Sequence, residues 1–529
     1  VTLNDVATAG ITLDTLEADA NVILTAAGNT AITNDAALAL QGAVTGTLAA
    51  TATTGGITDS SNLSATGNVT LNDVATAGIT LGTLEADANV ILTAAGNTAI
   101  TNDAALALQG TVTGTLAATA TTGDITDSDA LAVSGASVFT LGADGTNITL
   151  DSAANAFSGA VTLKAGSSGG QTFGNIVFVD SGAIDFDSAA SADGDLFLDG
   201  GTDNTVGGTL AVTATTGGIT DSATIAVTGD LTLNDVATAG ITLDTLEADA
   251  NVILTAAGNT AITNDAALAL QGAVTGTLAA TATTGGITDS SNLSATGNVT
   301  LNDVATAGIT LGTLEADANV ILTAAGNTAI TNDAALALQG TVTGTLAATA
   351  TTGDITDSDA LAVSGASVFT LGADGTNITL DSAANAFSGA VTLKAGSSGG
   401  QTFGNIVFVD SGAIDFDSAA SADGDLFLDG GTDNTVGGTL AVTATTGGIT
   451  DSATIAVTGD LTLDDVATAG ITLDTLEADA NVILTAAGNT AITNDAALAL
   501  QGAVTGTLAA TASAGGITDS SNLSATGNV

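Results

Sequence analysis

Residues 22–35 read VILTAAGNTAITND, and this stretch holds the pattern from which the rest of the chain is built. Short alternating runs recur along the chain, among them Ala31-Ile32-Thr33 in this stretch and Ile11-Thr12-Leu13 before it, and such runs are typical of strands with one buried face. The stretch also contains the pairs Gly28-Asn29 and Asn34-Asp35, which tolerate the left-handed backbone of tight turns. No stretch of the chain sustains the apolar stripe of a helix, and Thr and Gly are frequent. The sequence therefore predicts an all-β protein.

The whole chain repeats this pattern at two scales. The opening phrase Val1-Thr2-Leu3 returns near residue 69 with few changes, and again at Leu231 and Leu461, so a repeat of 68 residues lies inside one of 230. We therefore divide the chain by repeats and not by average domain size. The predicted units are 1–230 (1–68, 69–136, 137–230), 231–460 (231–298, 299–366, 367–460) and a partial third unit, 461–529.

A stacked architecture accounts best for these repeats. Dividing the 68-residue unit at its turn clusters gives segments of about 23 residues, which fits one coil of a parallel β-helix, or β-solenoid. We expect about three coils in each 68-residue unit, about four in the 94-residue part and about 23 in the chain, which gives a rod about 110 Å long. Residues 68 apart should then lie about 14 Å apart along one face. The alternative is a series of β-sandwich domains, but the 68-residue units lack the aromatic core residues that sandwiches use.

Composition restricts the partners and the location. Two basic residues against 55 acidic ones give a net charge of −53, which excludes nucleic acid and electrostatic binding to anionic lipid. Cations and further copies of the chain remain as expected partners. No apolar run is long enough to insert into a membrane, and neither a signal peptide nor Cys is present. We expect a piece of a longer array whose export signals lie outside it.

A resemblance supports that expectation. The phrases Val22-Ile23-Leu24-Thr25-Ala26-Ala27-Gly28-Asn29, Gly55-Gly56-Ile57-Thr58-Asp59-Ser60 and Gly67-Asn68-Val69-Thr70-Leu71 resemble those of bacterial filamentous-haemagglutinin-type and related β-strand-repeat surface proteins. The resemblance implies an exported, right-handed parallel β-helix that serves in adhesion or as an extended fibre. The secretion domain and the anchor of that family have no counterpart in these residues.

The residue inventory argues against catalysis. The chain lacks His, Cys, Tyr and Arg, so Ser-His-Asp triads, thiolate or imidazole zinc sites and His acid–base chemistry are impossible. A hydrolase with two carboxylates remains conceivable, but no aromatic platform for a sugar is evident. We expect no enzyme and no organic cofactor.

All twelve Phe and both Lys fall in residues 137–230 and the copy 367–460. One interpretation is that these coils are wider and that the Phe side chains fill them. The other is that exposed Phe side chains form a lateral contact between rods. The candidates for this contact, each with an equivalent Phe in the second copy, are Phe139, Phe157, Phe173, Phe178, Phe186 and Phe197.

The same part is rich in carboxylates, and oxygen ligands of this kind are what Ca²⁺ prefers. The EF-hand spacing is absent, and solvated turn carboxylates are the other interpretation. The candidate Ca²⁺ ligands are Asp180, Asp185, Asp187, Asp193, Asp195, Asp199 and Asp203, with the copies Asp410, Asp415, Asp417, Asp423, Asp425, Asp429 and Asp433.

The sequence as a whole favours an extracellular or cell-surface structural protein of a bacterium or archaeon. Its expected role is a rigid, non-catalytic rod, used as a filament, a sheath or an adhesin stalk. The first alternative is an adhesin whose Phe-bearing coils recognise a glycan or another cell. The second is a polysaccharide hydrolase on a β-helix.

Overall fold

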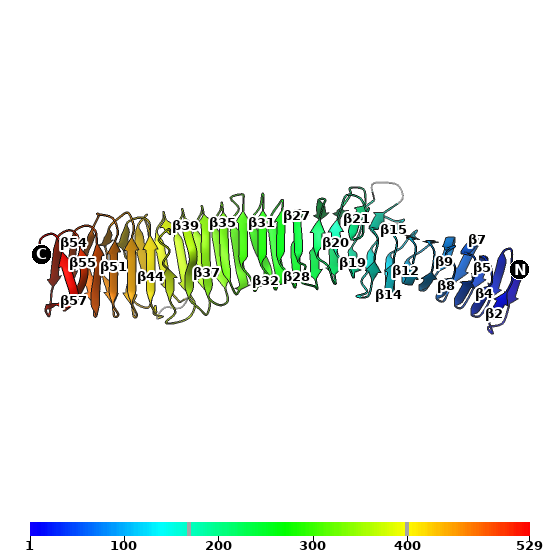
Figure 1. The fold of residues 1–529 in the computed structure, drawn as a ribbon, viewed down its shortest axis with the longest axis horizontal. Coiled ribbons are helices and arrows are strands. Elements are labelled where there is room, and N and C mark those ends of the chain that lie inside the picture. The colour runs from blue at the N-terminus through cyan, green and yellow to red at the C-terminus, as the bar shows by residue number, and fades with distance from the viewer. Residues whose placement is uncertain (167–170, 397–400) are drawn as a thin grey trace. The chain divides into compact units, whose positions relative to one another are not determined.

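The computed structural model describes residues 1–166, 171–396 and 401–529. These residues form strands and no helix, so the described part contains no helix able to cross a membrane. They divide into two compact units, 1–265 and 266–529, and each unit is described by itself. In each unit the strands stack as successive rungs across the ribbon (Figure 1).

The strands of the first unit are β1 (Thr2–Asp5), β2 (Ile11–Leu16), β3 (Val22–Ala26), β4 (Thr30–Asn34), β5 (Leu38–Val44), β6 (Leu48–Ala52), β7 (Ile57–Ala65), β8 (Val69–Asp73), β9 (Ile79–Ala86), β10 (Val90–Ala94), β11 (Thr98–Asn102), β12 (Leu106–Val112), β13 (Leu116–Ala120), β14 (Ile125–Val133), β15 (Ser137–Leu141), β16 (Ile148–Leu150), β17 (Ala156–Phe157), β18 (Val161–Ala165), β19 (Ile176–Asp180), β20 (Ile184–Phe186), β21 (Asp195–Asp199), β22 (Thr205–Val206), β23 (Leu210–Ala214), β24 (Ile219–Asp221), β25 (Ile225–Val227), β26 (Leu231–Asp235), β27 (Ile241–Ala248), β28 (Asn251–Ala256) and β29 (Thr260–Asn264).

The strands of the second unit are β30 (Leu268–Val274), β31 (Leu278–Ala282), β32 (Ile287–Ala295), β33 (Val299–Asp303), β34 (Ile309–Ala316), β35 (Asn319–Ala324), β36 (Thr328–Asn332), β37 (Leu336–Val342), β38 (Leu346–Ala350), β39 (Ile355–Val363), β40 (Ser367–Leu371), β41 (Ile378–Leu380), β42 (Ala386–Phe387), β43 (Val391–Ala395), β44 (Ile406–Asp410), β45 (Ile414–Phe416), β46 (Asp425–Asp429), β47 (Thr435–Val436), β48 (Leu440–Ala444), β49 (Ile449–Asp451), β50 (Ile455–Val457), β51 (Leu461–Asp465), β52 (Ile471–Ala478), β53 (Asn481–Ala486), β54 (Thr490–Asn494), β55 (Leu498–Val504), β56 (Leu508–Ala512) and β57 (Ile517–Ala525).

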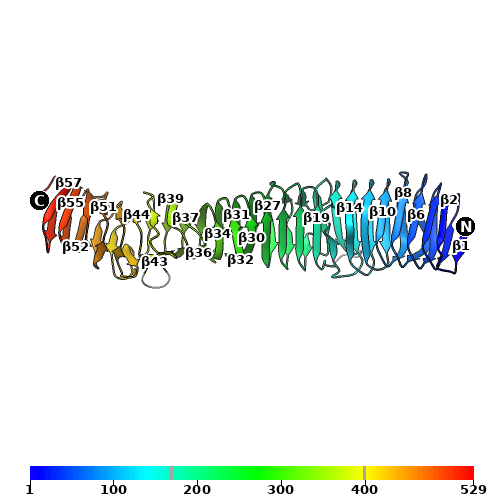
Figure 2. The same cartoon turned by 90° about the horizontal axis from the view of Figure 1, so that it is seen from below.

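The architecture is a parallel β-solenoid, as the sequence predicts. Successive strands alternate between two sheets, so that β1, β3, β5 and β7 pair in one sheet and β2, β4, β6 and β8 pair in the other, always in parallel. One coil therefore consists of two strands. The solenoid has about 25 coils, close to the predicted 23, and the second view shows the same stacking of rungs from another side (Figure 2).

The coils of the 68-residue repeats contain fewer residues than predicted. Paired residues lie 18 positions apart for Val22 and Leu40 and 22 apart for Ile57 and Ile79. The repeat 1–68 therefore contains seven strands, or three and a half coils, and the prediction of three longer coils is wrong. The prediction failed because it treated each turn-bounded segment as a complete coil, whereas a coil closes after two strands.

This half coil moves each repeat to the other sheet. Leu3 lies in β1 and its equivalent Leu71 lies in β8, and these two strands belong to different sheets of the first unit. The expectation that residues 68 apart share one face is therefore wrong. The 94-residue part also begins in one sheet, at β15, and the next repeat begins in the other, at β26. It too winds three and a half coils, not the four expected.

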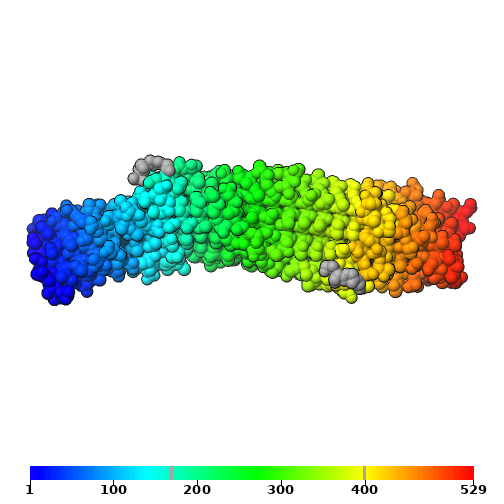
Figure 3. All heavy atoms as spheres, turned by 180° about the vertical axis from the view of Figure 1, so that it is seen from behind, coloured from blue at the N-terminus to red at the C-terminus, as the bar shows by residue number. Residues whose placement is uncertain are grey.

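The core follows the alternation of the strands. Inward side chains such as Val22, Leu24, Leu38 and Leu40 are at most 1% exposed. Outward side chains are small and lie in register, so that Thr51 pairs with Asn72 and Asn72 with Thr93 in the next rungs. The space-filling view shows regular rows of side chains along the green and yellow-green stretch of the second unit (Figure 3). The sequence pattern thus becomes a thin apolar core between two small-residue faces.

Polar side chains fix the corners of the coils. Asn102 is fully buried, and its side chain accepts a hydrogen bond from the Ala86 N–H (2.8 Å) and donates to the carbonyls of Ala86 and Ala105. Gly42 has a φ of +110°, and a Cβ there would meet the Leu24 carbonyl oxygen at 2.0 Å. Side-chain amides thereby satisfy backbone groups where the ladder is interrupted, and glycine takes a backbone conformation and a close approach that no side chain would fit.

Candidate functional site in the wide coils

Residues 137–230 contain the widest coils, around β18 to β23, and we call the coils of residues 137–230 the wide coils. Val161 pairs with Leu196, 35 positions later, and Ile176 pairs with Leu210, 34 positions later. In the sheet, β21 lies between β18 and β20, out of chain order. Gly194 and Asn204, which flank β21, both have positive φ. The additional residues thus add one rung and long connections to a single sheet.

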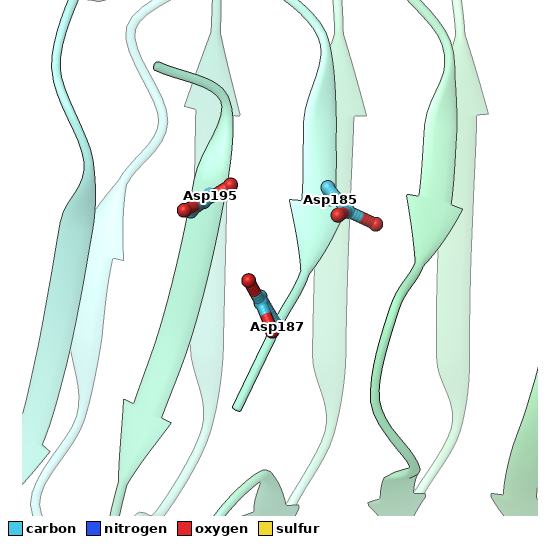
Figure 4. Close-up of side chains that lie close together, drawn as sticks. All are labelled: Asp185, Asp187 and Asp195. Atoms are coloured by element: carbon cyan, nitrogen blue, oxygen red, sulfur yellow. The ribbon is translucent and has the colours of Figure 1, made fainter. Parts of the chain in front are cut away.

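Three of the predicted carboxylates come together on these strands. One oxygen from each of Asp185, Asp187 and Asp195 lies within 4.8 Å of the other two. The side chains project from β20, from the residue after it and from β21, on adjacent rungs (Figure 4). The copies Asp415, Asp417 and Asp425 form the same group. We call each group an acidic cluster.

Neighbouring Ser and Thr residues already bind the acidic cluster. Asp185 accepts hydrogen bonds from the hydroxyls of Thr220 (2.8 Å) and Ser222 (2.6 Å). Asp195 accepts from the backbone and hydroxyl of Ser191 and from the Ala192 N–H. Burial acts to raise the pKa of Asp195, but these hydrogen bonds outweigh it and hold the pKa below its usual value. Asp195 therefore favours its ionised form, and the cluster offers oxygen ligands that a cation could use.

The other predicted ligands lie elsewhere. Asp180 is buried, and its carboxylate accepts a hydrogen bond from the Phe157 N–H at 2.9 Å. Asp199 forms an ion pair with Lys164 across the β18–β21 pair. Asp193 and Asp203 are exposed. The copies Asp410, Asp423, Asp429 and Asp433 lie at the equivalent positions and likewise do not belong to an acidic cluster.

Burial also perturbs Asp180. Desolvation raises the pKa of its carboxyl, against the lowering effect of hydrogen bonds from Phe157, Ser181 and Gly182. Asp180 is therefore buried within a coil and does not belong to the acidic cluster.

Most of the Phe side chains fill the wide coils. Phe139, Phe157, Phe173, Phe178 and Phe186 are at most 3% exposed, as are their copies. Phe157 packs edge-on against Phe139, with ring centroids 5.9 Å apart, and stacks on Phe178 at 5.4 Å. Five of the six Phe residues therefore cannot reach a neighbouring rod, and the lateral-contact interpretation is wrong for them. Phe197 faces outward and is half-buried.

Sequence reasoning missed a second recurrent feature, the bulged strands. In β9 the register shifts between the pairings of Ile100 and Asn102. Asp59 of the preceding rung holds this bulge, because its carboxylate accepts hydrogen bonds from the Gly82 N–H (2.9 Å) and the Thr83 hydroxyl (2.8 Å). The recurrent phrase Ile57-Thr58-Asp59-Ser60 was the available signal, and its Asp braces the next coil.

Comparison with known proteins gives one finding. No curated protein and no solved structure matches the chain. One family model, described as repeats of unknown function (DUF5649), matches residues 27–94, 95–164, 187–257, 257–324, 325–394 and 404–486. These matches cover more than half of the chain, which therefore belongs to the DUF5649 repeat family.

Proposed function

We propose that this chain is a stretch of an extracellular or cell-surface structural protein of a bacterium or archaeon, and that its solenoid is a rigid, non-catalytic rod. The observation that carries the proposal is the constant winding of the repeats. The short repeat 1–68 and the longer part 137–230 both add three and a half coils of continuous parallel pairing. Adding repeats therefore adds length, which is what a filament, sheath or stalk requires.

Composition and chemistry support the same role. The acidic cluster and the Phe-filled core each occur in two copies, whereas catalysis needs only one site. The residue types of most hydrolytic and redox centres are missing from the sequence. We also propose kinship with the filamentous-haemagglutinin-type surface proteins. The recurrent strand–turn phrases and the parallel solenoid support this proposal.

The partners in this proposal are copies of the chain and divalent cations. The net charge of −53 opposes close approach of parallel rods in dilute salt. Ca²⁺ at the acidic clusters would reduce that repulsion locally. Nucleic acid and a lipid bilayer are not partners of this stretch in the proposal.

An adhesin that recognises a glycan through its Phe side chains is the weaker candidate. Sugar recognition needs aromatic rings on the surface, and here five of each set of six are buried. No specific observation favours a carboxylate hydrolase over the rod.

Electron microscopy of the native source tests the proposal most directly. The expected result is filaments, sheaths or stalks whose length changes with repeat number. Deleting residues 231–460 should shorten the particle by about 50 Å, since ten and a half rungs at about 4.8 Å are lost. Compact globular particles, or loss of folding throughout the shortened chain, would contradict it.

A further inference from the structure

The bulged strands build a groove that recurs with the repeat. In the second unit one groove of about 250 Å³ is lined by Gly312, Leu314, Glu315, Thr331 and Asp333, among others. A second groove of the same volume is lined by the equivalent Asp474, Leu476, Glu477, Thr493 and Asp495. Neither groove includes a residue of the acidic clusters. The same cavity is thus formed twice by two copies of one sequence.

The backbone of each groove is held in the same way. Asp289 accepts hydrogen bonds from the N–H groups of Gly312 and Thr313. Asp451 does the same for Asp474 and Thr475, at 2.7 Å each. These bonds fix the bulge, and the carboxylates that make them point at backbone and are not free for a ligand. The groove is therefore a built feature of the coil.

The groove combines three kinds of surface. Leu314 is fully buried and lies at its base, Thr side chains supply hydroxyls, and Glu315 and Asp333 are exposed carboxylates on its wall. All five Glu residues of the chain occupy this one position of the repeat, namely Glu17, Glu85, Glu247, Glu315 and Glu477. The chain's two basic side chains, Lys164 and Lys394, pair with Asp199 and Asp429. No basic side chain therefore neutralises the groove from within the described residues.

The spacing of the carboxylates separates a metal ion from a larger cation. Within the described residues, groups of three carboxylates with oxygens within 4.8 Å occur only in the acidic clusters. Asp474, Glu477 and Asp495 line one groove but do not bring one oxygen each within 4.8 Å of the other two. A protonated amine suits this arrangement better, because its N–H groups can reach separate oxygens.

We propose that each groove binds the primary ammonium group of an alkylamine, either free or as a lysine side chain of a partner. This inference does not rest on the rod's location or on its catalytic inactivity. The carboxylates provide charge-assisted hydrogen bonds, and the Thr hydroxyls accept further ones.

The chain also contains its own charge variant of the groove. Asp474 stands where the other groove has Gly312, so one groove has three carboxylates and the other two. Asp14 and Asp244 share the first type, and Gly82 shares the second. We therefore expect two affinity classes, with the three-carboxylate grooves binding the amine more tightly.

Winding places successive copies of this Glu position on different sheets. Within the first unit Glu17 lies beside the end of β2 and Glu85 on β9, and these strands belong to different sheets. We therefore expect grooves at successive repeats to face in opposite directions. An array of this kind could hold partners on both of its faces.

Calorimetric titration of the full chain with spermidine at fixed ionic strength tests the proposal. Replacing all five Glu residues by Gln should weaken binding about fivefold, the ratio expected for losing one exposed charged contact per site. The control carries five exposed substitutions outside the grooves, with the same change in net charge: Asp129→Asn, Asp151→Asn, Asp359→Asn, Asp381→Asn and Asp519→Asn. It should weaken binding less than twofold. Gly312→Asp should convert one groove to the tighter class, because an added Cβ there meets nothing closer than 4.0 Å.

Two results would overturn the proposal. Equal weakening by the Glu and the Asp sets would mean that the amine is held only as a diffuse counter-ion. Stoichiometric displacement of spermidine by equimolar Ca²⁺, lost in the Glu→Gln protein, would mean that the grooves are metal sites. A lysine-rich peptide titrated in parallel identifies the source of the ammonium group. Binding of both probes supports ammonium recognition and points to a free amine. Binding of the peptide alone supports ammonium recognition and points to a protein partner.

Discussion

The narrow coils of residues 1–136 and the wide coils of residues 137–230 differ in length but not in winding. Each of the two narrow repeats, 1–68 and 69–136, completes three and a half coils, and so does the longer part 137–230. The additional residues of this longer part go into long connections and into the inserted rung β21. Each part therefore adds the same number of coils, although the number of residues in a coil varies.

This comparison shows where the chain accepts change. In the narrow coils Ala, Val and Leu side chains fill the core, whereas Phe139, Phe157 and Phe178 are packed together in the wide part. The outward additions carry the acidic cluster and the ion pair of Lys164 with Asp199. Each repeat must return to the ladder in register, because the next coil pairs with it along its whole length.

The largest expected effect lies in the Phe-filled core. Phe157→Ala should destabilise the wide coils by about 3–5 kcal/mol, because it removes a ring that contacts two others and leaves a cavity. Val133→Ala, at the end of the neighbouring β14, should cost only about 1.5 kcal/mol for two methyl groups. Hydrogen exchange measured coil by coil would show both losses near the substitution. A loss of protection spread evenly along the chain would contradict nearest-neighbour stacking.

A smaller effect is expected at the corners of the narrow coils. Asn102→Ala leaves the Ala86 N–H and the carbonyls of Ala86 and Ala105 without their side-chain partner. Buried polar groups left unpaired cost about 1–3 kcal/mol. Asn72→Ala on the outer face is the matched control and should change stability by less than about 0.5 kcal/mol. Chemical denaturation distinguishes the two, and equal effects would show that the buried amide does not brace the corner.

The third prediction concerns pH in the wide part. Because burial raises the pKa of Asp180 above its unfolded value of 3.8, its stabilising contribution is complete below pH 3.8 and is lost as pH rises through the folded value. Asp180→Asn keeps an acceptor for the Phe157 N–H and removes this loss. The variant should therefore melt at a higher temperature than the parent at pH 7, with the difference closing near pH 3.

Asp144 provides a control of opposite sign. Hydrogen bonds from the Thr172 backbone and hydroxyl lower its pKa, so its contribution is present above pH 3.8 and is lost on acidification. Asp144→Asn should remove part of the acid sensitivity and should not raise the melting temperature at pH 7. If both variants changed stability in the same direction at pH 7, this account of the carboxyl groups would fail.

The smallest expected effect is that of removing divalent cations. If Ca²⁺ occupies the acidic clusters, chelation at low ionic strength should lower the melting temperature and reduce the lateral association seen by light scattering. The Asp185→Asn/Asp415→Asn protein should show neither response. A parent protein whose melting and scattering do not change on chelation would leave these carboxylates as solubilising charge.

Sequence reasoning predicted the parallel solenoid and nearly the right number of coils, because alternation and turn pairs are local signals. It could not predict the half coil, since that depends on which segments pair, and the Gln41-Gly42 step shows that a strand can continue through an apparent turn. It listed seven carboxylates in each wide part, but only three of them meet. Asp195 comes beside Asp185 because β21 pairs out of chain order, and no spacing along the chain encodes that order.

The half-coil winding is most directly tested by distances between spin labels at cysteines introduced on outward positions, since the chain has no Cys of its own. Thr51 and Thr111 lie in one column of paired residues, three rungs apart, and labels there should be about 14 Å apart. Thr51 and its repeat equivalent Thr119 lie in different sheets. Labels at these two sites should be about 30 Å apart, given sheets about 10 Å apart and labels that point away from each other. A Thr51–Thr119 distance as short as that between Thr51 and Thr111 would place successive repeats on the same face and contradict the winding of three and a half coils.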